Sequence, residues 1–458
     1  MALTSTSAER IAEIRESQRR YFASGATLDI DFRKKSLKAF EKAVLKWEKP
    51  LCEALWKDLH KSYEEAYMTE ISILLGEIRT HIRKIGKWAR PQRKCTPLKM
   101  FPSRSRIISE PLGTALIISP WNYPVQLLLT PLVGAISSGC TAVLKPSPYV
   151  PTVSEVIEKM IEDTFPEEYV AVTQGHRDVN TLLLEQRWDI IFFTGSPSLG
   201  RLVMASAAKN LTPVVLELGG KSPCIIDRDA DIQVAARRVA WGKSLNSGQT
   251  CIAPDYLMLH KDIKDDFLKA LQLEFHNLLG ENPQESRHFV RIVNDKSLER
   301  LESYLKDGDI VFGGHTDHRD RYFEPTVLDN VSPDAPVMQE EIFGPIFPVQ
   351  TFEDIDEVIT FINGREKPLA LYYFGKQGDK VLRHTSSGGS CINDTIMHIA
   401  NEHVPFGGVG MSGMGSYHGK LSFDAFTHHR AVIESGTTID LPFRYMPYKF
   451  FSLVKRLL

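Results

Sequence analysis

The stretch that decides the fold is TALIISPWNYPVQLLLTPLVGAISSGCTAVLK, residues 114–145. Its short apolar runs at 114–119 and 141–144 predict buried strands, and the longer run at 125–138 predicts a helix that ends at Gly139. The same alternation of short strands and helices continues to residue 218. Because such units pack as a parallel sheet with helices on both faces, the sequence predicts the α/β class.

The flanking sequence predicts further units around this sheet. Residues 6–90 carry apolar side chains at helical intervals and predict helices, with Pro50 expected to split or kink one of them. The strand-and-helix pattern restarts after Gly220 and predicts a second α/β domain. Residues 105–109 predict a strand set apart from the main fold, and the glycine-rich residues 401–417 predict a loop.

The composition narrows the class of protein. With 458 residues, of which 43% are hydrophobic and 24% charged, the chain predicts about three globular domains and no extensive disorder. The net charge of −2 gives no basic field, so we expect no nucleic-acid partner. The 6 cysteines show neither a C-x-x-C pair nor metal-ligand spacing, which predicts free thiols, a reducing compartment and no metal site. The N-terminus lacks the apolar core of a signal peptide, and no apolar run reaches the roughly 20 residues of a membrane span, so we expect a cytoplasmic protein.

Cys251 is the candidate nucleophile. It ends the run SGQTC, residues 247–251, whose small and polar side chains suit a partly accessible thiol. A single cysteine is more often an inert, small apolar side chain, and we keep that interpretation for the other cysteines.

Two polar side chains in or after predicted strands are candidates to assist the thiol. Glu217 lies in an otherwise apolar strand that ends at Gly219, where desolvation would raise its pKa toward that of a general base. Taken alone, Glu217 could equally be a carboxylate at a strand end that reaches solvent or pairs with Lys221. Asn122 follows a strand at the edge where ligands bind in α/β sheets, and its amide could donate to an oxyanion. Taken alone, an asparagine that satisfies its own turn is the simpler interpretation.

Two further runs are candidates to hold a cofactor. The run GSPSLG, residues 195–200, follows a strand and opens a helix, a context that suits a dinucleotide pyrophosphate. An ordinary turn with a serine cap fits as well, because the run is not G-x-G-x-x-G. Glu341, in the run EEIFGP at 340–345, is a candidate cofactor clamp. Gly220-Lys221-Ser222 does not complete a P-loop, since Val215 stands where that motif needs glycine.

These motifs, in this order and spacing, resemble the NAD(P)-dependent aldehyde dehydrogenase superfamily over residues 10–440. The short N-terminus and the run from PFGG at 405–408 to GSYHGK at 415–420 are similar to the class 3 branch, which includes fatty and aromatic aldehyde dehydrogenases. The resemblance implies a Rossmann-like cofactor-binding domain, an α/β catalytic domain and a small β oligomerisation arm. The implied bounds are 1–93, 112–219 and 396–420 for the NAD(P)-binding domain, 220–395 for the catalytic domain, 94–111 and 421–445 for the arm, and 446–458 for a basic aromatic tail.

The resemblance also implies a reaction, the oxidation of an aldehyde to a carboxylic acid with NAD or NADP as cofactor. Cys251 would attack the aldehyde carbon to give a thiohemiacetal, and the Asn122 side chain with the Cys251 N–H would hold the oxyanion. Glu217 would then activate the water that hydrolyses the thioester. The implied substrates are medium- or long-chain aliphatic or aromatic aldehydes. The residues implied at the cofactor are Trp121, Lys145, Gly195, Ser196, Gly200, Glu341 and Phe343.

One position departs from the family pattern. Relatives commonly carry a glutamate after Lys-Pro-Ser, where it accepts from the ribose hydroxyls, and this chain has Pro148. An acidic group there would repel a 2′-phosphate, so its absence predicts use of both NAD and NADP.

The resemblance implies a homodimer, with strands near 105–109 and 430–440 forming an arm between subunits. After Asp440 the chain has basic and aromatic side chains and no acid. The basic side chains of this segment are Arg444, Lys449, Lys455 and Arg456, and they lie among Phe443, Tyr445, Tyr448, Phe450, Phe451 and Leu453. Such a segment suits an anionic membrane surface, but packing along a partner or along the chain itself is the favoured interpretation.

Two other kinds of function are alternatives. The same thiol could serve an esterase or pass an acyl group to coenzyme A, although Glu217 favours water as the acceptor. A catalytically silent binding protein could keep the fold, although intact Cys251, Glu217 and Asn122 speak against it.

Overall fold

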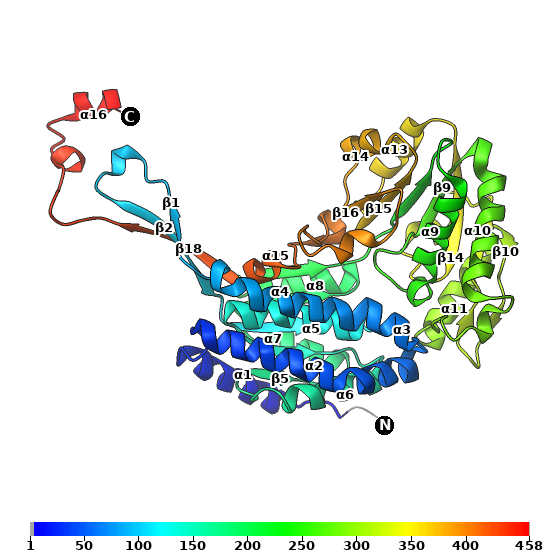
Figure 1. Cartoon of the computed structure of the whole chain (residues 1–458), viewed down its shortest axis with the longest axis horizontal. Coiled ribbons are helices and arrows are strands. Elements are labelled where there is room, and N and C mark those ends of the chain that lie inside the picture. Colours follow the sequence, from blue (N-terminus) through cyan, green and yellow to red (C-terminus); the bar gives the residue numbers. More distant parts are fainter. Residues whose placement is uncertain (1–3, 458) are drawn as a thin grey trace.

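The computed structural model describes residues 4–457 and shows two α/β bodies with a projecting β arm (Figure 1). The predictions that concern Met1 to Leu3 and Leu458 fall outside the described residues.

The first body is built on a sheet with the strand order β17-β7-β6-β3-β4-β5. Its strands are β3 (Thr114–Ile118), β4 (Thr141–Lys145), β5 (Val170–Val172), β6 (Ile190–Thr194), β7 (Val214–Glu217) and β17 (Gly413–Met414). Strands β3 to β7 pair in parallel, and β17 joins β7 antiparallel at the edge. The predicted α/β class is confirmed.

Both faces of this sheet are buried, because successive side chains of a strand point to opposite sides. Leu116 and Ile118 of β3 belong to one apolar cluster, and Ala115 and Ile117 belong to another. The helices in the first cluster are α1 (Ala8–Ala23), α7 (Arg177–Glu185) and α8 (Pro197–Ala208), and those in the second include α2 (Ile30–Leu59), α4 (Ser72–Trp88), α5 (Pro124–Ser138) and α6 (Pro151–Glu162). Burial on both faces is the reason that β3 is a continuous apolar run in the sequence.

Helix α2 runs without a break across Pro50, so the predicted split does not occur. The side chains of Leu51, Leu55 and Leu59, which follow the proline, are fully buried. This packing holds the helix together although proline removes one backbone donor from it.

The second body contains a sheet with the order β10-β13-β14-β9-β8-β15-β16. Its strands are β8 (Pro223–Ile226), β9 (Tyr256–His260), β10 (Asp309–Phe312), β13 (Thr326–Asp329), β14 (Ile346–Phe352), β15 (Ala370–Phe374) and β16 (Gly389–Ile392). All neighbours are parallel except β10 and β13. The helices of this part include α9 (Ile232–Ser244), α10 (Lys264–Leu279), α11 (Asp295–Ser303), α12 (Pro336–Gln339), α13 (Ile355–Asn363) and α14 (Gly378–His384).

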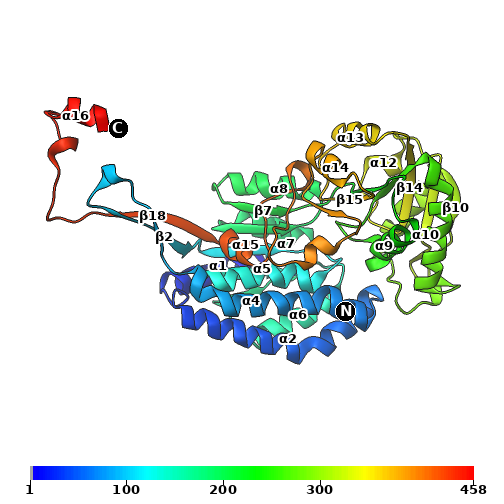
Figure 2. The same ribbon diagram turned by 45° about the horizontal axis from the view of Figure 1, so that its top comes forward.

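The arm is a separate antiparallel sheet that projects from the first body (Figures 1 and 2). It consists of β1 (Gln92–Lys94), β2 (Arg104–Pro111) and β18 (Thr427–Glu434). Strand β2 contains the predicted 105–109, whereas β18 begins and ends earlier than the strand predicted near 430–440. The chain then continues to α16 (Phe451–Leu457) at the far end of the arm (Figure 2).

The sequence predicted a loop over the glycine-rich residues 401–417, but part of this segment forms a strand. Gly413 and Met414 form β17 and pair with Glu217 and Leu216. Gly413 has a φ of +152°, and a Cβ on it would lie 2.4 Å from the carbonyl oxygen of Leu216. Only glycine permits this close approach, so a residue that favours loops here completes a sheet edge.

Residues 4–457 contain neither a candidate membrane span nor a candidate metal cluster. No helix there is both long enough and apolar enough to cross a membrane. The same residues bring together no cluster of three or more His, Cys, Asp or Glu side chains suited to a metal ion.

Candidate active site

Cys251 follows a backbone turn of unusual conformation. Asn246, Ser247 and Gly248 have φ values of +51°, +54° and +71°, so successive residues adopt the left-handed region. Side-chain-bearing residues adopt this region at an energetic cost and persist there only where their surroundings hold them. The turn connects α9 to Cys251, whose side chain is half-buried.

The environment of Cys251 favours the protonated thiol. Burial raises the pKa of the Cys251 thiol above its ordinary value, and the carboxylates of Glu341 and Glu217 raise it further. Hydrogen bonds from the backbone N–H groups of Cys251 and Ile252 act in the opposite direction. The resting sulfur therefore needs a proton acceptor before it becomes a nucleophile.

Glu217 is a buried carboxyl group without a partner. It ends β7, between Thr194 of β6 and Gly413 of β17, and its side chain is 3% exposed. Neither carboxyl oxygen makes a hydrogen bond. Desolvation raises the pKa of Glu217 well above its ordinary value, and a raised pKa makes a carboxylate a stronger base.

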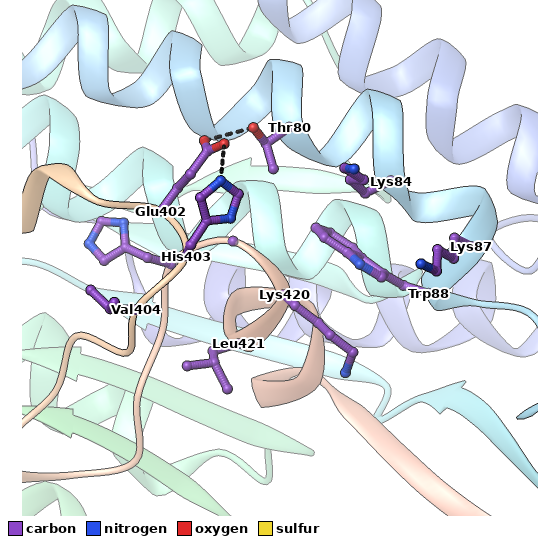
Figure 3. Close-up of a pocket in the computed structure, with 11 residues that line it drawn as sticks. Thr80, Lys84, Lys87, Trp88, Glu402, His403, Val404, Lys420 and Leu421 are labelled. Carbon is purple, nitrogen blue, oxygen red and sulfur yellow. Dashed lines mark hydrogen bonds and ion pairs between the residues drawn. The ribbon is translucent and has the colours of Figure 1, made fainter.

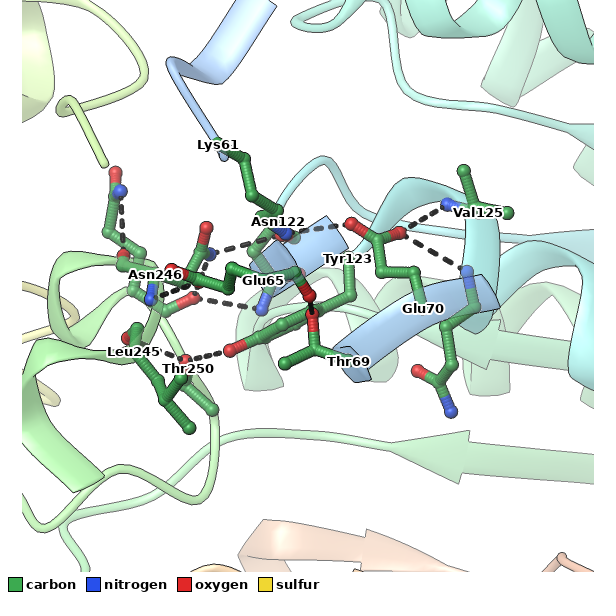
Figure 4. A network of polar contacts seen from close by, with 12 residues as sticks. Lys61, Glu65, Thr69, Glu70, Asn122, Tyr123, Val125, Leu245, Asn246 and Thr250 are labelled. Carbon is green, nitrogen blue, oxygen red and sulfur yellow. Dashed lines mark hydrogen bonds and ion pairs between the residues drawn. The ribbon is translucent and has the colours of Figure 1, made fainter. Parts of the chain in front are cut away.

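Asn122 lies against the loop that carries Cys251. Its buried Nδ2 donates to the carbonyl oxygen of Gln249 at 3.0 Å, and its Oδ1 makes no hydrogen bond. Tyr123 extends this contact, because its hydroxyl lies 2.7 Å from Thr250 Oγ1 (Figure 4). The structure thus brings the predicted oxyanion donor to the segment directly before the nucleophile.

Tyr417 is a neighbour of these groups that sequence reasoning did not single out. Its hydroxyl is buried, and the nearby Glu217 and Cys251 add to the effect of burial in raising its pKa. Tyr417 lies at the end of the segment that was predicted to be a loop, and the motif GSYHGK that contains it was used only for the family resemblance. A neutral phenol thus lies near the candidate base.

Glu341 is held beside Gly219 by a network behind its loop. Lys221 pairs with Asp255 and donates to the carbonyl oxygens of Val337 and Glu340 at 2.8 and 2.9 Å. Asp255 Oδ2 in turn accepts from the N–H of Ile342 at 2.8 Å. Burial and the charge of Asp255 raise the pKa of Glu341 to about 8. This network fixes the main chain on either side of the Glu341 carboxylate.

Phe343 and Trp121 form the aromatic part of the site. Their ring centroids are 5.4 Å apart in an edge-to-face arrangement, and Phe343 has a φ of +51°. Edge-to-face contact is a favourable geometry for aromatic pairs. The two predicted cofactor residues are therefore in contact, although they come from distant parts of the sequence.

A cavity of about 1040 Å³ lies between the two bodies. Ser196 at the start of α8, Gly219 and Glu341 line it, together with Lys221 and Arg300. The Ser196 hydroxyl accepts from the N–H of Leu199 and caps the helix. Of the predicted cofactor residues, only Ser196 and Glu341 belong to this lining.

Gly200 and Lys145 lie elsewhere in the first body. A Cβ on Gly200 would come 2.7 Å from the Leu218 side chain, so this glycine lets α8 pack closely on the end of β7. Lys145 ends β4, is 1% exposed, and donates to the carbonyl oxygen of Pro146 at 2.7 Å. Desolvation lowers the pKa of Lys145 to about 8, and the charge of Asp178 opposes that change.

These residues fit a dinucleotide cofactor. The cavity is large enough for an extended ligand, one end is a helix N-terminus that suits phosphate, and Glu341 Oε1 is buried without a partner. A carboxylate in that state is suited to accept from a sugar hydroxyl. The placement of Ser196 and Glu341 at one cavity is the observation that supports the fit.

A second, smaller cavity of about 250 Å³ lies beside α4 (Figure 3). Lys84, Lys87 and Trp88 line it, and Thr80 Oγ1 donates to Glu402 at 2.7 Å at its rim. None of the residues predicted to act on the aldehyde or the cofactor lines this cavity, so it is separate from the candidate active site.

Comparison with known proteins agrees with this geometry. A model of the aldehyde dehydrogenase family matches residues 1–432. The 4,4′-diaponeurosporen-aldehyde dehydrogenase of Staphylococcus aureus is 47% identical over 434 residues, which cover 94% of this chain and 95% of that protein. Human aldehyde dehydrogenase family 3 member B1 is 45% identical, over 91% of this chain and 89% of its own length. The solved structure of the substrate-bound state of Staphylococcus aureus AldH superposes with a TM-score of 0.96 at 45% identity, over 98% of this chain and 99% of that one.

The chain therefore belongs to the aldehyde dehydrogenase family. More narrowly, it is an NAD(P)-dependent aldehyde dehydrogenase of the class 3 branch, as the resemblance of its motifs predicted. Its activity is the oxidation of aldehydes to carboxylic acids.

Proposed function

We propose that this chain oxidises large apolar aldehydes, medium- or long-chain aliphatic or aromatic, through a covalent intermediate on Cys251. The observation that carries the proposal is the convergence of a half-buried thiol, an amide bonded to its loop and an unpaired buried carboxyl group, from Cys251, Asn122 and Glu217. These are the groups that nucleophilic attack, oxyanion stabilisation and proton transfer require.

The residues act in a fixed order. Cys251 loses its proton to solvent water and its thiolate attacks the aldehyde carbon, which leaves a thiohemiacetal oxyanion facing the Asn122 amide and the Cys251 N–H. NAD(P)+, when bound, supplies the acceptor for the hydride that leaves this carbon, and the oxyanion then collapses to a thioester on Cys251. Glu217 takes a proton from water, the hydroxide adds to the thioester carbon, and the carboxylic acid departs from the thiol.

Apolar side chains close to Cys251 in the sequence support the substrate class. Trp241 and Leu245, which precede Cys251 in the chain, are partly buried and pack against the same apolar cluster as Cys251. One relative is named for 4,4′-diaponeurosporen-aldehyde, and a solved relative with a TM-score of 0.86 and 27% identity for indole-3-acetaldehyde. Both named aldehydes carry a large unsaturated organic group. We propose that the aldehyde oxidised by this chain carries such a group as well.

The cofactor proposal is dual use of NAD and NADP. Pro148 carries no charge to repel a 2′-phosphate, and Lys145 is a cation at the end of the neighbouring strand. The negative charge of Asp178 acts on Lys145. The same charge would repel a phosphate bound near Lys145. The ratio of kcat/KM for the two cofactors measures the balance, and a strong preference for NAD would contradict dual use.

The assembly proposal is a homodimer formed through the arm. Strand β18 lies at one edge of the arm sheet, and apolar side chains of the arm such as Leu98 and Ile433 are 87% and 50% exposed. Exposed edges and apolar side chains favour pairing with another chain. Light scattering coupled to gel filtration would give the mass, and a monomer at micromolar concentration would contradict the proposal.

The tail after Asp440 has two candidate environments. The exposed aromatic side chains of Phe443, Tyr445 and Tyr448 suit either packing along a partner subunit, which we favour, or contact with an anionic membrane. Flotation of the intact protein with anionic liposomes, compared with a chain truncated after Asp440, separates the two. We also propose a cytoplasmic location, supported by the free state of the described cysteines.

The decisive experiment is an NAD(P)H-release assay over aliphatic and aromatic aldehydes, with Cys251→Ala as control. We expect release by the wild-type chain and none by the variant, while the variant still binds NADH. Release by Cys251→Ala would exclude the covalent mechanism. Absence of release with every aldehyde would favour the silent-protein alternative, and acyl-coenzyme A formation in the presence of coenzyme A would favour acyl transfer.

A further inference from the structure

A buried ion pair lies against the turn that contains Asn122 (Figure 4). Lys61 Nζ lies 2.7 Å from Glu70 Oε1, and both side chains have no exposed surface. Lys61 Nζ also donates to the carbonyl oxygen of Asn122 at 3.0 Å and lies 4.2 Å from the ring centroid of Tyr123. A lysine immediately after α2 thus holds the main chain of the proposed oxyanion donor.

Glu70 connects the same pair to the next helix. It lies in η1 (Tyr67–Ile71), and its Oε2 accepts from the N–H groups of Val125 and Gln126 at 2.8 and 3.3 Å. These N–H groups belong to the first turn of α5, where a negative charge is favourable. The ion pair therefore holds the chain at Asn122 and again at the start of α5.

Glu65 makes the corresponding contact with the loop of Cys251. It lies in α3 (Tyr63–Ala66), and its Oε1 accepts from the N–H of Asn246 at 2.8 Å. Asn246 is the first of the left-handed residues, and its Nδ2 donates to the carbonyl oxygens of Asn122 and Gln249, both at 3.0 Å. One asparagine thus bridges the oxyanion donor and the nucleophile loop.

We propose that Lys61, Glu65 and Glu70 are positioning residues that set the place of Asn122 relative to Cys251. The three side chains come from residues 61–70 and touch neither the cofactor cavity nor the reacting thiol. Buried charges of this kind add little net stability, since desolvation offsets much of their attraction. Their contacts instead fix two catalytic segments that are more than a hundred residues apart in the chain. The proposal rests on the roles of Cys251 and Asn122 given above.

The test separates positioning from stability by means of a paired variant. Lys61→Met leaves the Glu70 carboxylate buried and unpaired, so it should lower both Tm and kcat. The double variant Lys61→Met with Glu70→Gln removes both charges while glutamine keeps an oxygen for Val125 and Gln126, and it should restore Tm. The carbonyl of Asn122 still lacks its lysine donor in the double variant, so kcat for aldehyde oxidation should stay about 100-fold below wild type.

Glu65 has a matched control in its neighbour. Glu65→Leu should lower kcat, because the N–H of Asn246 loses its acceptor. Glu64→Leu should leave kcat unchanged, because Glu64 is exposed and pairs with Arg287 at the surface. In all variants KM for NAD+ and the affinity for NADH, measured by fluorescence, should stay within about twofold of wild type, since the network does not reach the cofactor cavity.

Each outcome has one meaning. Recovery of kcat together with Tm in the double variant, or equal effects of the Glu64 and Glu65 substitutions, would overturn the positioning role. Low kcat with restored Tm and unchanged NADH affinity would support it. If Cys251→Ala were active, the covalent mechanism itself would fail, whatever the network variants did.

Discussion

The carboxylate of Glu341 occupies the space where a side chain of residue 219 would begin. A Cβ built on Gly219 would lie 2.0 Å from Glu341 Oε2 and 2.6 Å from Cδ. The backbone of Gly219 is not in the left-handed region, so glycine is required here by packing and not by conformation. The strand end that carries Glu217 and the loop that carries Glu341 are therefore in direct contact.

Gly219→Ala should weaken cofactor binding. The methyl group would displace the Glu341 carboxylate from the cavity wall, and we expect KM for NAD+ to rise about tenfold. Initial rates over a range of NAD+ concentrations measure this. Gly76→Ala is the matched control, because a Cβ on Gly76 in α4 would meet nothing within 4 Å. An unchanged KM in Gly219→Ala would contradict the cofactor role of Glu341.

Glu217→Gln should stop the reaction after the oxidation step. Without a base for the water, the thioester on Cys251 should accumulate, so that about one NAD(P)H per subunit forms rapidly before a slow phase follows. Stopped-flow absorbance measures the burst, and mass spectrometry of the quenched protein detects the acyl group. A steady rate equal to that of the wild type would remove Glu217 from the hydrolytic step.

The same substitution should stabilise the protein at high pH. The pKa of Glu217 is higher in the folded state than its value of 4.5 in the unfolded state. Below pH 4.5 the group is neutral in both states and costs no stability. As the pH rises from 4.5 toward the folded pKa, the unfolded state loses this proton more readily, so the free energy of unfolding falls. Each unit of raised pKa corresponds to about 1.4 kcal/mol. Glutamine does not titrate, so the Tm of Glu217→Gln should exceed that of the wild type by more at pH 8 than at pH 5. A constant Tm difference over this range would argue against a buried, unpaired carboxyl group.

Glu341→Gln should make the Cys251 thiol more reactive. The Glu341 carboxylate is the largest charge effect that raises the pKa of Cys251, so its removal should lower that pKa. At pH 9, above the Glu341 pKa of about 8, iodoacetamide should therefore alkylate Cys251 faster in the variant. The rate should be followed on the Cys251 peptide by mass spectrometry, because the exposed Cys95 would react as well. Equal rates in the two proteins would contradict the assigned charge effect.

Pro148→Glu should shift the cofactor preference toward NAD. A carboxylate at this position would repel a 2′-phosphate, and we expect the ratio of kcat/KM for NAD to that for NADP to rise about tenfold or more. Pro148→Gln is the uncharged control. If both substitutions changed the ratio equally, charge at position 148 would not be its cause.

The sequence predicted those parts of the fold and the site that depend on residues close together in the chain, such as apolar runs and short motifs. Strands β3 and β4 and helix α5 were predicted because each is an apolar run of suitable length, bounded by glycine or proline. The candidate groups Cys251 and Glu217 were found because they stand in short polar or strand-end motifs, and their roles remain predictions that the experiments above test.

Other features depend on tertiary contacts and have no local signal. Lys61 follows a helix in the same way as many solvated lysines, and only the folded chain brings it to Asn122. Pro50 was expected to interrupt its helix because a proline lowers local propensity, whereas the buried leucines beyond it outweigh that effect. Gly413 was placed in a loop because glycine favours loops, and its pairing with Glu217 depends on the neighbouring strand.

Strand β17 has a consequence for the link between assembly and chemistry. Its two residues form the wall beside Glu217, and the chain continues from them through α15 (Lys420–Ala425) directly into β18 of the arm. A two-residue ladder at a sheet edge is among the first parts of a sheet to open. A shift of β18 along its axis would therefore reach the strand that pairs with Glu217 through a short covalent path. If this segment moves as a unit, docking of the arm on a second chain would change how readily water reaches Glu217. Entry of water at Glu217 would change the affinity of the arm by the same free energy.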